Sequence, residues 1–268
     1  YYIQLGQRVG SQTFYNYFDA FGFTSRTGVD LPSETGFMQY YKANQLGEVQ
    51  LASSAFGQAM AITPLQMCTA VAAAVNGGYL VTPHVVDKIT DANGNVIEEI
   101  GANVRRQVIS ESTSNVIRQI MEYEVGAGTG GGKYAYVSGY RIGGKSGTSE
   151  QLNMDRRADG DYKKVASFAA VLPADDPEII VYVMLDDPNN ARTDYSSLLA
   201  APVVGNIISE IAPYLGIAAD GEDRSQTVVT VPNLVGTEWS SAQVQLNIKG
   251  LRHQLAESTT SQAAAAVT

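Results

Sequence analysis

The sequence has 268 residues, of which 44% are hydrophobic and 17% charged, enough to form the core of one or two domains. Its net charge of −9 and its pI near 4.7 argue against a nucleic-acid-binding surface, which would need a basic patch. The single cysteine, Cys68, excludes an internal disulfide, and no apolar run reaches the ~18 residues of a membrane span. Because His84 and His253 lack metal-ligand spacing, we expect no metal site and no cofactor.

The N-terminal third predicts helices joined by turns. Residues 1–20 carry a rough helical stripe of apolar side chains, and residues 27–34 follow as a loop of turn residues. Thr63 and Pro64 then form a strong helix start, an N-cap followed by proline at the first helical position. We expect this helix to end at residues 76–78, Asn-Gly-Gly, and to be buried, because it is apolar on nearly all sides.

The middle of the chain predicts a hairpin, a helix and a strand. Residues 91–95, Asp-Ala-Asn-Gly-Asn, form a hairpin turn between short apolar runs. Ser110 begins a helix, which a glycine-rich loop at 126–132 follows. We expect the next strand over residues 137–148 and a solvated polar loop over residues 149–163.

Two strands and a long helix complete the larger part of the chain. We expect strands at 165–172 and 178–185, joined by a turn in which Asp175 and Asp176 are turn formers rather than catalysts. A helix over 195–215 follows. After a polar segment, the chain predicts a small helix and a strand in a unit of about 40 residues, below the size that usually holds a core alone.

One stretch, Arg141 to Thr148, combines groups that suit substrate binding. In a strand, Lys145 and Gly147 share one face, and Ser146 and Thr148 share the other. Gly147 lacks a side chain, so another backbone can approach it closely. Lys-Ser/Thr-Gly is also the third motif of serine acyl-transferases that react with penicillin. Taken alone, the same residues equally fit a glycine-rich hairpin on a solvated edge.

The order of several landmarks resembles the transpeptidase domain of class B penicillin-binding proteins, over roughly residues 1–216. In chain order they are Phe21-Gly22-Phe23, Gly28-Val29-Asp30-Leu31-Pro32-Ser33-Glu34, Ala55-Phe56-Gly57-Gln58, Thr63-Pro64-Leu65-Gln66, Tyr140-Arg141-Ile142-Gly143-Gly144-Lys145-Ser146-Gly147-Thr148 and Asp186-Asp187-Pro188. Residues 231–257 resemble the start of a PASTA domain, a module of cell-wall enzymes and kinases.

The resemblance implies a fold and a domain organisation. The fold is α/β (α+β): an antiparallel sheet flanked by helices, as in penicillin-binding transpeptidases and serine β-lactamases, plus a small α+β PASTA-like unit. Residues 1–221 would be the C-terminal part of the transpeptidase domain, residues 222–230 a linker, and residues 231–268 a partial PASTA-like domain.

The resemblance also implies a reaction, in which a serine D,D-transpeptidase cross-links peptidoglycan stem peptides through an acyl-enzyme, and β-lactams acylate the same serine. Lys145 would supply a fixed cation, and the hydroxyls of Ser146 and Thr148 would bind the substrate carboxylate. Gly147 would let the substrate lie beside the strand, and the backbone N–H of Thr148 would be one oxyanion-hole donor. The expected location is the extracytoplasmic face of the bacterial membrane, with an anchor outside this sequence and partners in cell-division or sporulation wall synthesis.

The family's other two motifs are missing from this sequence. No serine before Lys145 is followed three residues later by lysine, and Ser-x-Asn does not occur. We therefore expect the nucleophile, its lysine base and the second motif to lie upstream of Tyr1, and this chain alone to be inactive. Two alternatives stay open, a catalytically idle relative that binds or senses cell wall and a β-lactamase.

Glu150 is a local departure from the resemblance, because many relatives have glutamine at this place. A carboxylate there would oppose an anionic substrate. We therefore expect Glu150 to point to solvent or to pair with Arg156 or Arg157.

Overall fold

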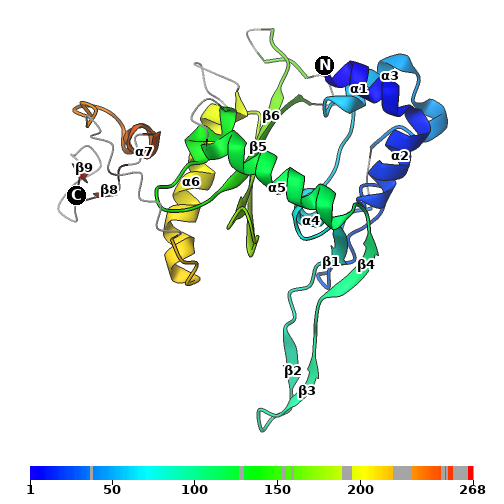
Figure 1. Cartoon of the computed structure of the whole chain (residues 1–268), viewed down its shortest axis with the longest axis horizontal. Helices are drawn as coiled ribbons and strands as arrows, with labels where there is room; N and C mark the ends of the chain where they lie inside the picture. Colours follow the sequence, from blue (N-terminus) through cyan, green and yellow to red (C-terminus); the bar gives the residue numbers. More distant parts are fainter. Residues whose placement is uncertain are drawn as a thin grey trace. The chain divides into compact units, whose positions relative to one another are not determined.

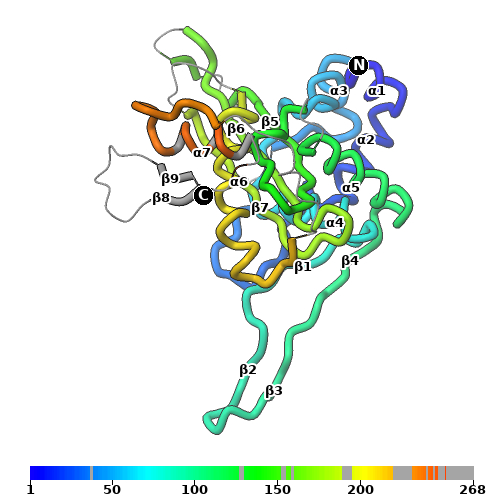
Figure 2. Tube along the Cα trace, turned by 60° about the vertical axis from the view of Figure 1, so that its left-hand side comes forward, coloured from blue at the N-terminus to red at the C-terminus, as the bar shows by residue number. Residues whose placement is uncertain are grey.

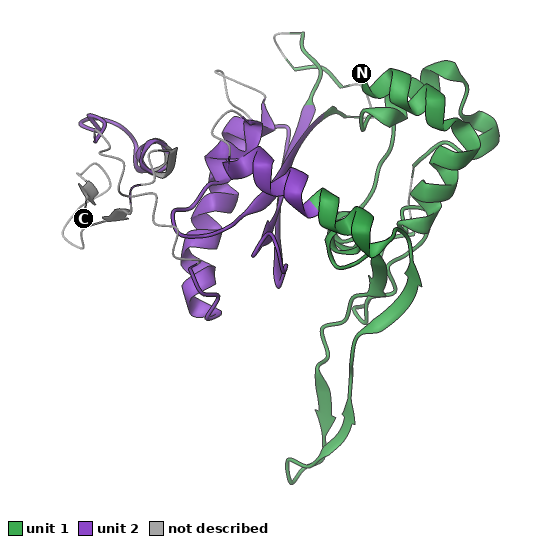
Figure 3. Cartoon of the chain, viewed as in Figure 1, with its two compact units in different colours: residues 1–117, 149–163 green, residues 118–148, 164–268 purple. Residues whose placement is uncertain are grey.

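The computed structural model describes residues 1–36, 39–126, 130–151, 155–157, 160–188, 195–219, 231–248, 251, 253–255 and 265–267. The chain divides into two compact units (Figure 3). Unit 1 comprises residues 1–117 and 149–163, and unit 2 comprises residues 118–148 and 164–268.

Short helices form the first part of unit 1 (Figure 1). They are α1 (Tyr2–Val9), α2 (Ser11–Ala20), the 3₁₀ helix η1 (Ala43–Gln45), α3 (Glu48–Ala55) and α4 (Pro64–Val75). The prediction of one helix over residues 1–20 is wrong, because Gly10 has φ 79°, a left-handed conformation that interrupts the helix. A Cβ on Gly6 would lie 2.6 Å from the Cβ of Ala55, so glycine lets α1 pack closely on α3.

The predicted helix start at Thr63 is confirmed. The Thr63 hydroxyl accepts the Gln66 N–H at 3.1 Å, and Gln66 Oε1 accepts the Thr63 N–H at 2.9 Å, which is a capping box. Gln66 is only 1% exposed, and its Nε2 donates to the carbonyl of Ser25 at 2.9 Å. This one side chain therefore joins the start of α4 to the loop that follows α2.

Two strand pairs complete the described part of unit 1. Strand β1 (Tyr79–Thr82) pairs antiparallel with β4 (Asn103–Gln107), and β2 (Lys88–Thr90) pairs antiparallel with β3 (Val96–Glu99). The predicted hairpin turn is confirmed between β2 and β3, which form an exposed arm extending away from the rest of unit 1 (Figures 1 and 2). Sequence patterning did not predict β4, since its Asn-Val-Arg-Arg-Gln sequence lacks an apolar alternation.

The loop at residues 27–34 is closed by a carboxylate. Oε1 of Glu34 accepts the N–H of Thr27 at 2.7 Å and its hydroxyl at 2.6 Å, and Oε2 accepts the Gly28 N–H at 3.0 Å. Partial burial alone would raise the pKa of Glu34, but these hydrogen bonds outweigh it and lower the pKa. In the same loop, the N–H groups of Val86 and Val85 hydrogen-bond the Asp30 carboxylate and lower its pKa.

These pKa shifts predict an acid-sensitive unit 1. Because the folded-state pKa of Glu34 lies below its unfolded value of 4.5, its contribution to stability is complete above that value and is lost as the pH falls through the folded pKa. We expect Glu34→Gln to lower the unfolding temperature at neutral pH and to reduce the loss of stability between about pH 5 and about pH 3. Thermal unfolding followed by circular dichroism across this range is the measurement, with Glu98→Gln on the exposed strand β3 as matched control. An unchanged pH profile in Glu34→Gln would contradict the prediction.

Unit 2 is built on an antiparallel sheet flanked by helices, so the predicted fold class is confirmed. The strand order is β5 (Gly143–Glu150), β6 (Lys164–Leu172) and β7 (Ile179–Asp186), and β6 pairs antiparallel with β7 along its length. The helical elements are α5 (Glu111–Gly126), which begins in unit 1, the 3₁₀ helix η2 (Gly131–Ala135) and α6 (Ser196–Tyr214).

The core of unit 2 lies between the sheet and α6. Its central members are Phe168, Leu172, Val204 and Ile208, each at most 1% exposed. By length and composition α6 could also cross a bilayer, but it packs on β6, β7 and η2, which identifies it as the core helix of this unit.

The strand predicted over residues 137–148 begins only at Gly143. Residues 137–142 contribute Val137 and Ile142 to the core from an irregular segment, so their apolar character reflects burial rather than strand pairing. Past the end of α6, the expected linker at 222–230 lies outside the described residues.

The C-terminal elements are α7 (Trp239–Ile248), β8 (His253–Leu255) and β9 (Ala265–Val267), the last two paired antiparallel. The buried side chains of α7 include Ala242 and Leu246, both on the predicted apolar stripe. Asn206 Nδ2 on α6 donates to Gln243 Oε1 on α7 at 3.3 Å, so α7 contacts the core helix.

Candidate active site

Strand β5 carries the predicted Lys-Ser-Gly-Thr site at one edge of the sheet. In the sheet that the described residues form, β6 is the neighbour of β5, and β7 lies beyond it. Lys145, Gly147 and Thr148 are exposed, and Ser146 is half-buried. An exposed edge strand presents backbone N–H and C=O groups to which an extended peptide can add as a further strand.

The Lys145 ammonium lies directly over this edge. Its Nζ donates to the carbonyl of Ser146 at 2.7 Å, and the side chain is exposed. The positive charge is therefore held beside the backbone of the strand, where a substrate carboxylate can approach it. A cation placed in this way attracts an anion most strongly when a bound ligand excludes water.

The hydroxyl of Thr148 is held by the first residue of α6. Thr148 Oγ1 donates to Ser196 Oγ at 2.9 Å and accepts the backbone N–H of Ser196 at 3.2 Å. Ser196 is 2% exposed. Sequence reasoning missed Ser196, which lies 48 residues from Thr148, and the only local signal was a serine at a helix start.

Ser146 faces the same side of β5 as Thr148, as strand alternation predicted. A Cβ on Gly131 of η2 would lie 3.9 Å from Ser146 Oγ and 3.5 Å from Oε1 of Glu124. Glu124 itself accepts the Gly131 N–H at 3.1 Å. The end of α5, the start of η2 and the start of α6 therefore surround the two hydroxyls of the motif.

The glycines of β5 allow close packing against β6. A Cβ on Gly147 would lie 3.0 Å from Oγ of Ser167, whose hydroxyl donates to the Gly147 carbonyl at 3.3 Å. A Cβ on Gly144 would lie 2.6 Å from the ring of Phe168, a fully buried core residue. Glycine at these two places thus sets the distance between the candidate site and the core.

Arg141 braces the turn that precedes β5. Its Nε and Nη2 donate to the two carboxylate oxygens of Glu122 at 2.6 and 2.8 Å, and its Nη1 pairs with Asp175. The bidentate geometry is typical of a strong arginine–carboxylate pair. Asp175, in the turn between β6 and β7, therefore has Arg141 as a structural partner.

Glu150 at the far end of β5 is exposed, in agreement with the first of the two expectations for it. Its backbone N–H donates to Oε1 of Gln58 at 3.2 Å. Arg156 contacts other partners, the carbonyl of Gly160 at 2.6 Å and the ring of Tyr162 at 4.0 Å.

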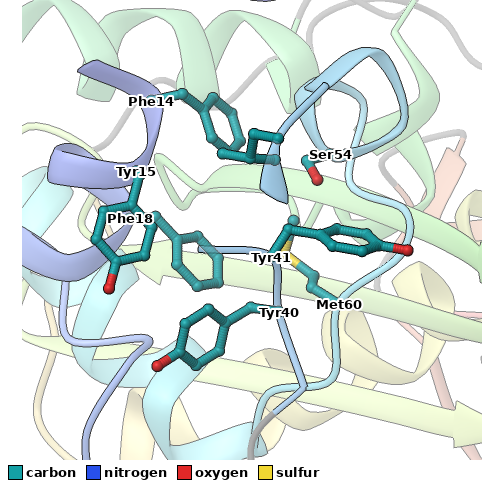
Figure 4. Close-up of a pocket in the computed structure, with 8 residues that line it drawn as sticks. Phe14, Tyr15, Phe18, Tyr40, Tyr41, Ser54 and Met60 are labelled. Carbon is teal, nitrogen blue, oxygen red and sulfur yellow. The ribbon is translucent and has the colours of Figure 1, made fainter. Parts of the chain in front are cut away.

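Unit 1 contains a separate small pocket lined mainly by aromatic rings (Figure 4). Tyr15 and Phe18 of α2 face Tyr40 across it, with ring centroids 6.4 Å and 5.6 Å from that of Tyr40. The other lining residues are Phe14, Tyr41, Leu46, Ser54 and Met60. The lining residues carry no carboxylate, imidazole or ammonium group, so β5, which carries Lys145, remains the candidate active site.

Comparison with known proteins finds a matching family and several relatives. Residues 1–209 match the family described as the penicillin binding protein transpeptidase domain. The chain is 36% identical over 259 residues to stage V sporulation protein D of Bacillus subtilis, covering 92% of the chain and 39% of that protein. It is 33% identical over 238 residues to a probable peptidoglycan D,D-transpeptidase FtsI of Caulobacter vibrioides, covering 85% of the chain and 38% of that protein. The chain thus spans about two fifths of the length of these curated relatives.

A solved structure supports the fold assignment. Penicillin-binding protein 3 of Mycobacterium tuberculosis, in complex with ampicillin, superimposes with a TM-score of 0.69 at 28% identity. The match covers 82% of this chain and 49% of that protein.

Proposed function

This chain belongs to the transpeptidase-domain family of class B penicillin-binding proteins, and from this premise we propose that it is the part of a serine D,D-transpeptidase that carries the third catalytic motif. In the proposed reaction, the serine Oγ forms an ester with the penultimate D-Ala of a stem peptide. The amide bond to the last D-Ala breaks, and the serine proton leaves with that amine. An amine of a neighbouring stem then attacks the ester, forms the cross-link and releases the serine.

The observation that carries this proposal is the exposed edge strand β5 with its Lys-Ser-Gly-Thr sequence. The stem peptide would lie along β5, and Lys145 would attract its carboxylate and keep a positive charge near the nucleophile. The hydroxyl of Ser146 would be available to that carboxylate, since the hydroxyl of Thr148 already donates to Ser196 Oγ. The backbone N–H of Thr148 would donate to the oxyanion, a contribution of about 2.7–4 kcal/mol.

We propose that Gly147 contributes by its lack of a side chain. A larger residue would enlarge this exposed position of β5 and would also press on Ser167 of the neighbouring strand. Glycine therefore suits both a ligand that lies beside the strand and the contact with β6.

The substrate and location follow from the same family. The M. tuberculosis relative was solved in complex with ampicillin, which supports β-lactams as ligands of this chain's parent protein. Peptidoglycan stem peptides as substrates imply action outside the cytoplasmic membrane. We propose a membrane anchor, the serine and its lysine base in sequence upstream of Tyr1, and partners that build cell wall during division or sporulation.

The test of the proposed function uses the full-length protein, which contains this chain together with its upstream sequence. After incubation with benzylpenicillin, an intact-mass spectrum should show the mass of one added β-lactam. Alanine in place of the upstream serine should abolish the adduct. A folded full-length protein without adduct would instead support the catalytically idle relative, and rapid release of hydrolysed penicillin would support a β-lactamase.

We further propose the domain division 1–221, 222–230 and 231–268, the last a partial PASTA-like domain. The order of one helix followed by two antiparallel strands supports it, as does the burial of Ala242 and Leu246 on α7. So small a core needs support, which the contact of α7 with α6 supplies. Hydrogen exchange should then show protected amides in α7, and uniformly fast exchange beyond residue 231 would contradict the division.

A further inference from the structure

We propose that Ser196 is a positioning residue for acylation, acting through Thr148; this inference rests on the proposed function. Two hydrogen bonds of opposite direction join these residues, because the Thr148 hydroxyl both donates to the Ser196 hydroxyl and accepts the Ser196 N–H, at 2.9 and 3.2 Å. With both bonds in place, the Thr148 side chain has one orientation in which its donor and its acceptor are satisfied together. We call this pair the Thr148–Ser196 clamp.

The clamp is anchored in the buried core of unit 2. Ser196 is 2% exposed, and Ala200, Ala201 and Val204 of the same helix are fully buried. The N-cap residue Tyr195 provides no side-chain cap hydrogen bond, so the Thr148 hydroxyl from β5 satisfies a backbone N–H at the start of α6. The clamp therefore ties the end of the motif strand to the core helix.

The two hydroxyls of the motif have different roles in this proposal. The Thr148 hydroxyl proton is directed to Ser196 Oγ, so its hydrogen bond goes to the fold and not to a ligand. Thr148 then serves acylation chiefly through its backbone N–H, which the clamp keeps in place. Ser146, which faces the same side, becomes the main hydroxyl donor to the ligand carboxylate. Catalytic donors need to be held within about 0.5 Å of the productive position.

Ser196→Ala tests the clamp in the full-length protein. Stopped-flow acylation with a fluorescent penicillin separates the acylation rate constant from the dissociation constant of the initial complex. We expect the rate constant to fall about tenfold, which corresponds to about 1.4 kcal/mol, and the dissociation constant to change less than about twofold. Ser209→Ala is the matched control, since it makes the same change in α6 at a hydroxyl that bonds the carbonyl of Asn206 in its own helix.

A double-mutant cycle with Thr148→Val makes the test specific, because valine keeps the shape and the backbone N–H of Thr148 but lacks the hydroxyl. In the Thr148→Val background, Ser196→Ala should change the acylation rate constant by less than about twofold. If Ser196→Ala lowered the acylation rate constant equally in the wild-type and Thr148→Val backgrounds, or lowered it in neither, the clamp would be overturned. The proposed function would still stand, because the wild-type protein would form the adduct. A wild-type protein that forms no adduct would overturn both. If Ser196→Ala fails to fold, Ser196→Thr and Ser196→Val decide, because these two residues have the same shape and only threonine keeps the hydroxyl. The clamp predicts slower acylation by the valine variant than by the threonine variant, and equal rate constants for the two would overturn it.

Discussion

Replacing Lys145 by alanine in the full-length protein should lower the second-order rate constant of β-lactam acylation about 100- to 1000-fold, the loss typical of removing one preorganised electrostatic group. The ammonium lies 2.7 Å from the carbonyl of Ser146, directly over the exposed edge of β5. In the proposed function, this ammonium attracts the carboxylate of an incoming ligand and favours negative charge as it develops. Lys145→Arg should recover only part of the rate, because the wider guanidinium fork cannot occupy the same point.

Two control variants distinguish the effect of the Lys145 charge at the site from the effect of a changed net charge of the protein. Lys88→Ala makes the same change on the exposed arm of unit 1, and Glu150→Gln removes a charge at the exposed end of β5. Both should acylate at the wild-type rate within about twofold, since exposed charges are screened by salt over about 10 Å. Acylation by Lys145→Ala at a rate within fivefold of wild type would contradict the assigned role, and an effect of Glu150→Gln would show that its carboxylate acts on the ligand.

Local signals in the sequence predicted the elements whose causes are local. The helix start at Thr63 was predictable because the capping box and the proline lie within four consecutive residues. Strands β6 and β7 were predictable because continuous apolar runs are bounded by a turn. The hairpin arm followed from its Asp-Ala-Asn-Gly-Asn turn, although its strands are exposed on both faces.

The two errors have different causes, a local backbone break at Gly10 and burial without strand pairing. The helix over residues 1–20 breaks at Gly10, because the left-handed backbone there divides two helices that share an apolar pattern. The strand at 137–148 starts late, because Val137 and Ile142 are buried without pairing in a ladder. A sequence pattern reports which side chains are apolar, and it does not report whether strand pairing or packing alone buries them.

The candidate site shows the same limit. Lys145 to Thr148 could be proposed as a site because they are consecutive, and their alternating faces followed from strand geometry. Ser196 was not recognised, because its only link to the motif is spatial. The reason for glycine at residue 144 was likewise invisible, since it depends on the ring of Phe168 in the neighbouring strand.

Gly144→Ala should destabilise unit 2 and slow acylation together. The added Cβ would lie 2.6 Å from a ring carbon of Phe168 and 3.0 Å from a methyl group of Val125, both fully buried, so neither neighbour can move into solvent. Overpacking of this kind costs about 1–3 kcal/mol. Alanine also lowers the conformational entropy of the unfolded chain, which stabilises the folded protein by about 0.4–1 kcal/mol. Because this gain is smaller than the cost of the clash, we expect a net loss of stability. The unfolding temperature should fall by about 2–4 °C for each kcal/mol lost.

Gly101→Ala is the matched control for this substitution, because a Cβ there would meet no atom within 4 Å. It should leave the unfolding temperature unchanged or raise it slightly. The clash at residue 144 is relieved if β5 moves away from β6, and this movement would shift Lys145 and Thr148 relative to α6. Gly144→Ala should therefore acylate more slowly even at temperatures where it is fully folded. Normal acylation in a destabilised Gly144→Ala protein would mean that the core absorbs the added methyl group and that the position of β5 does not depend on this contact.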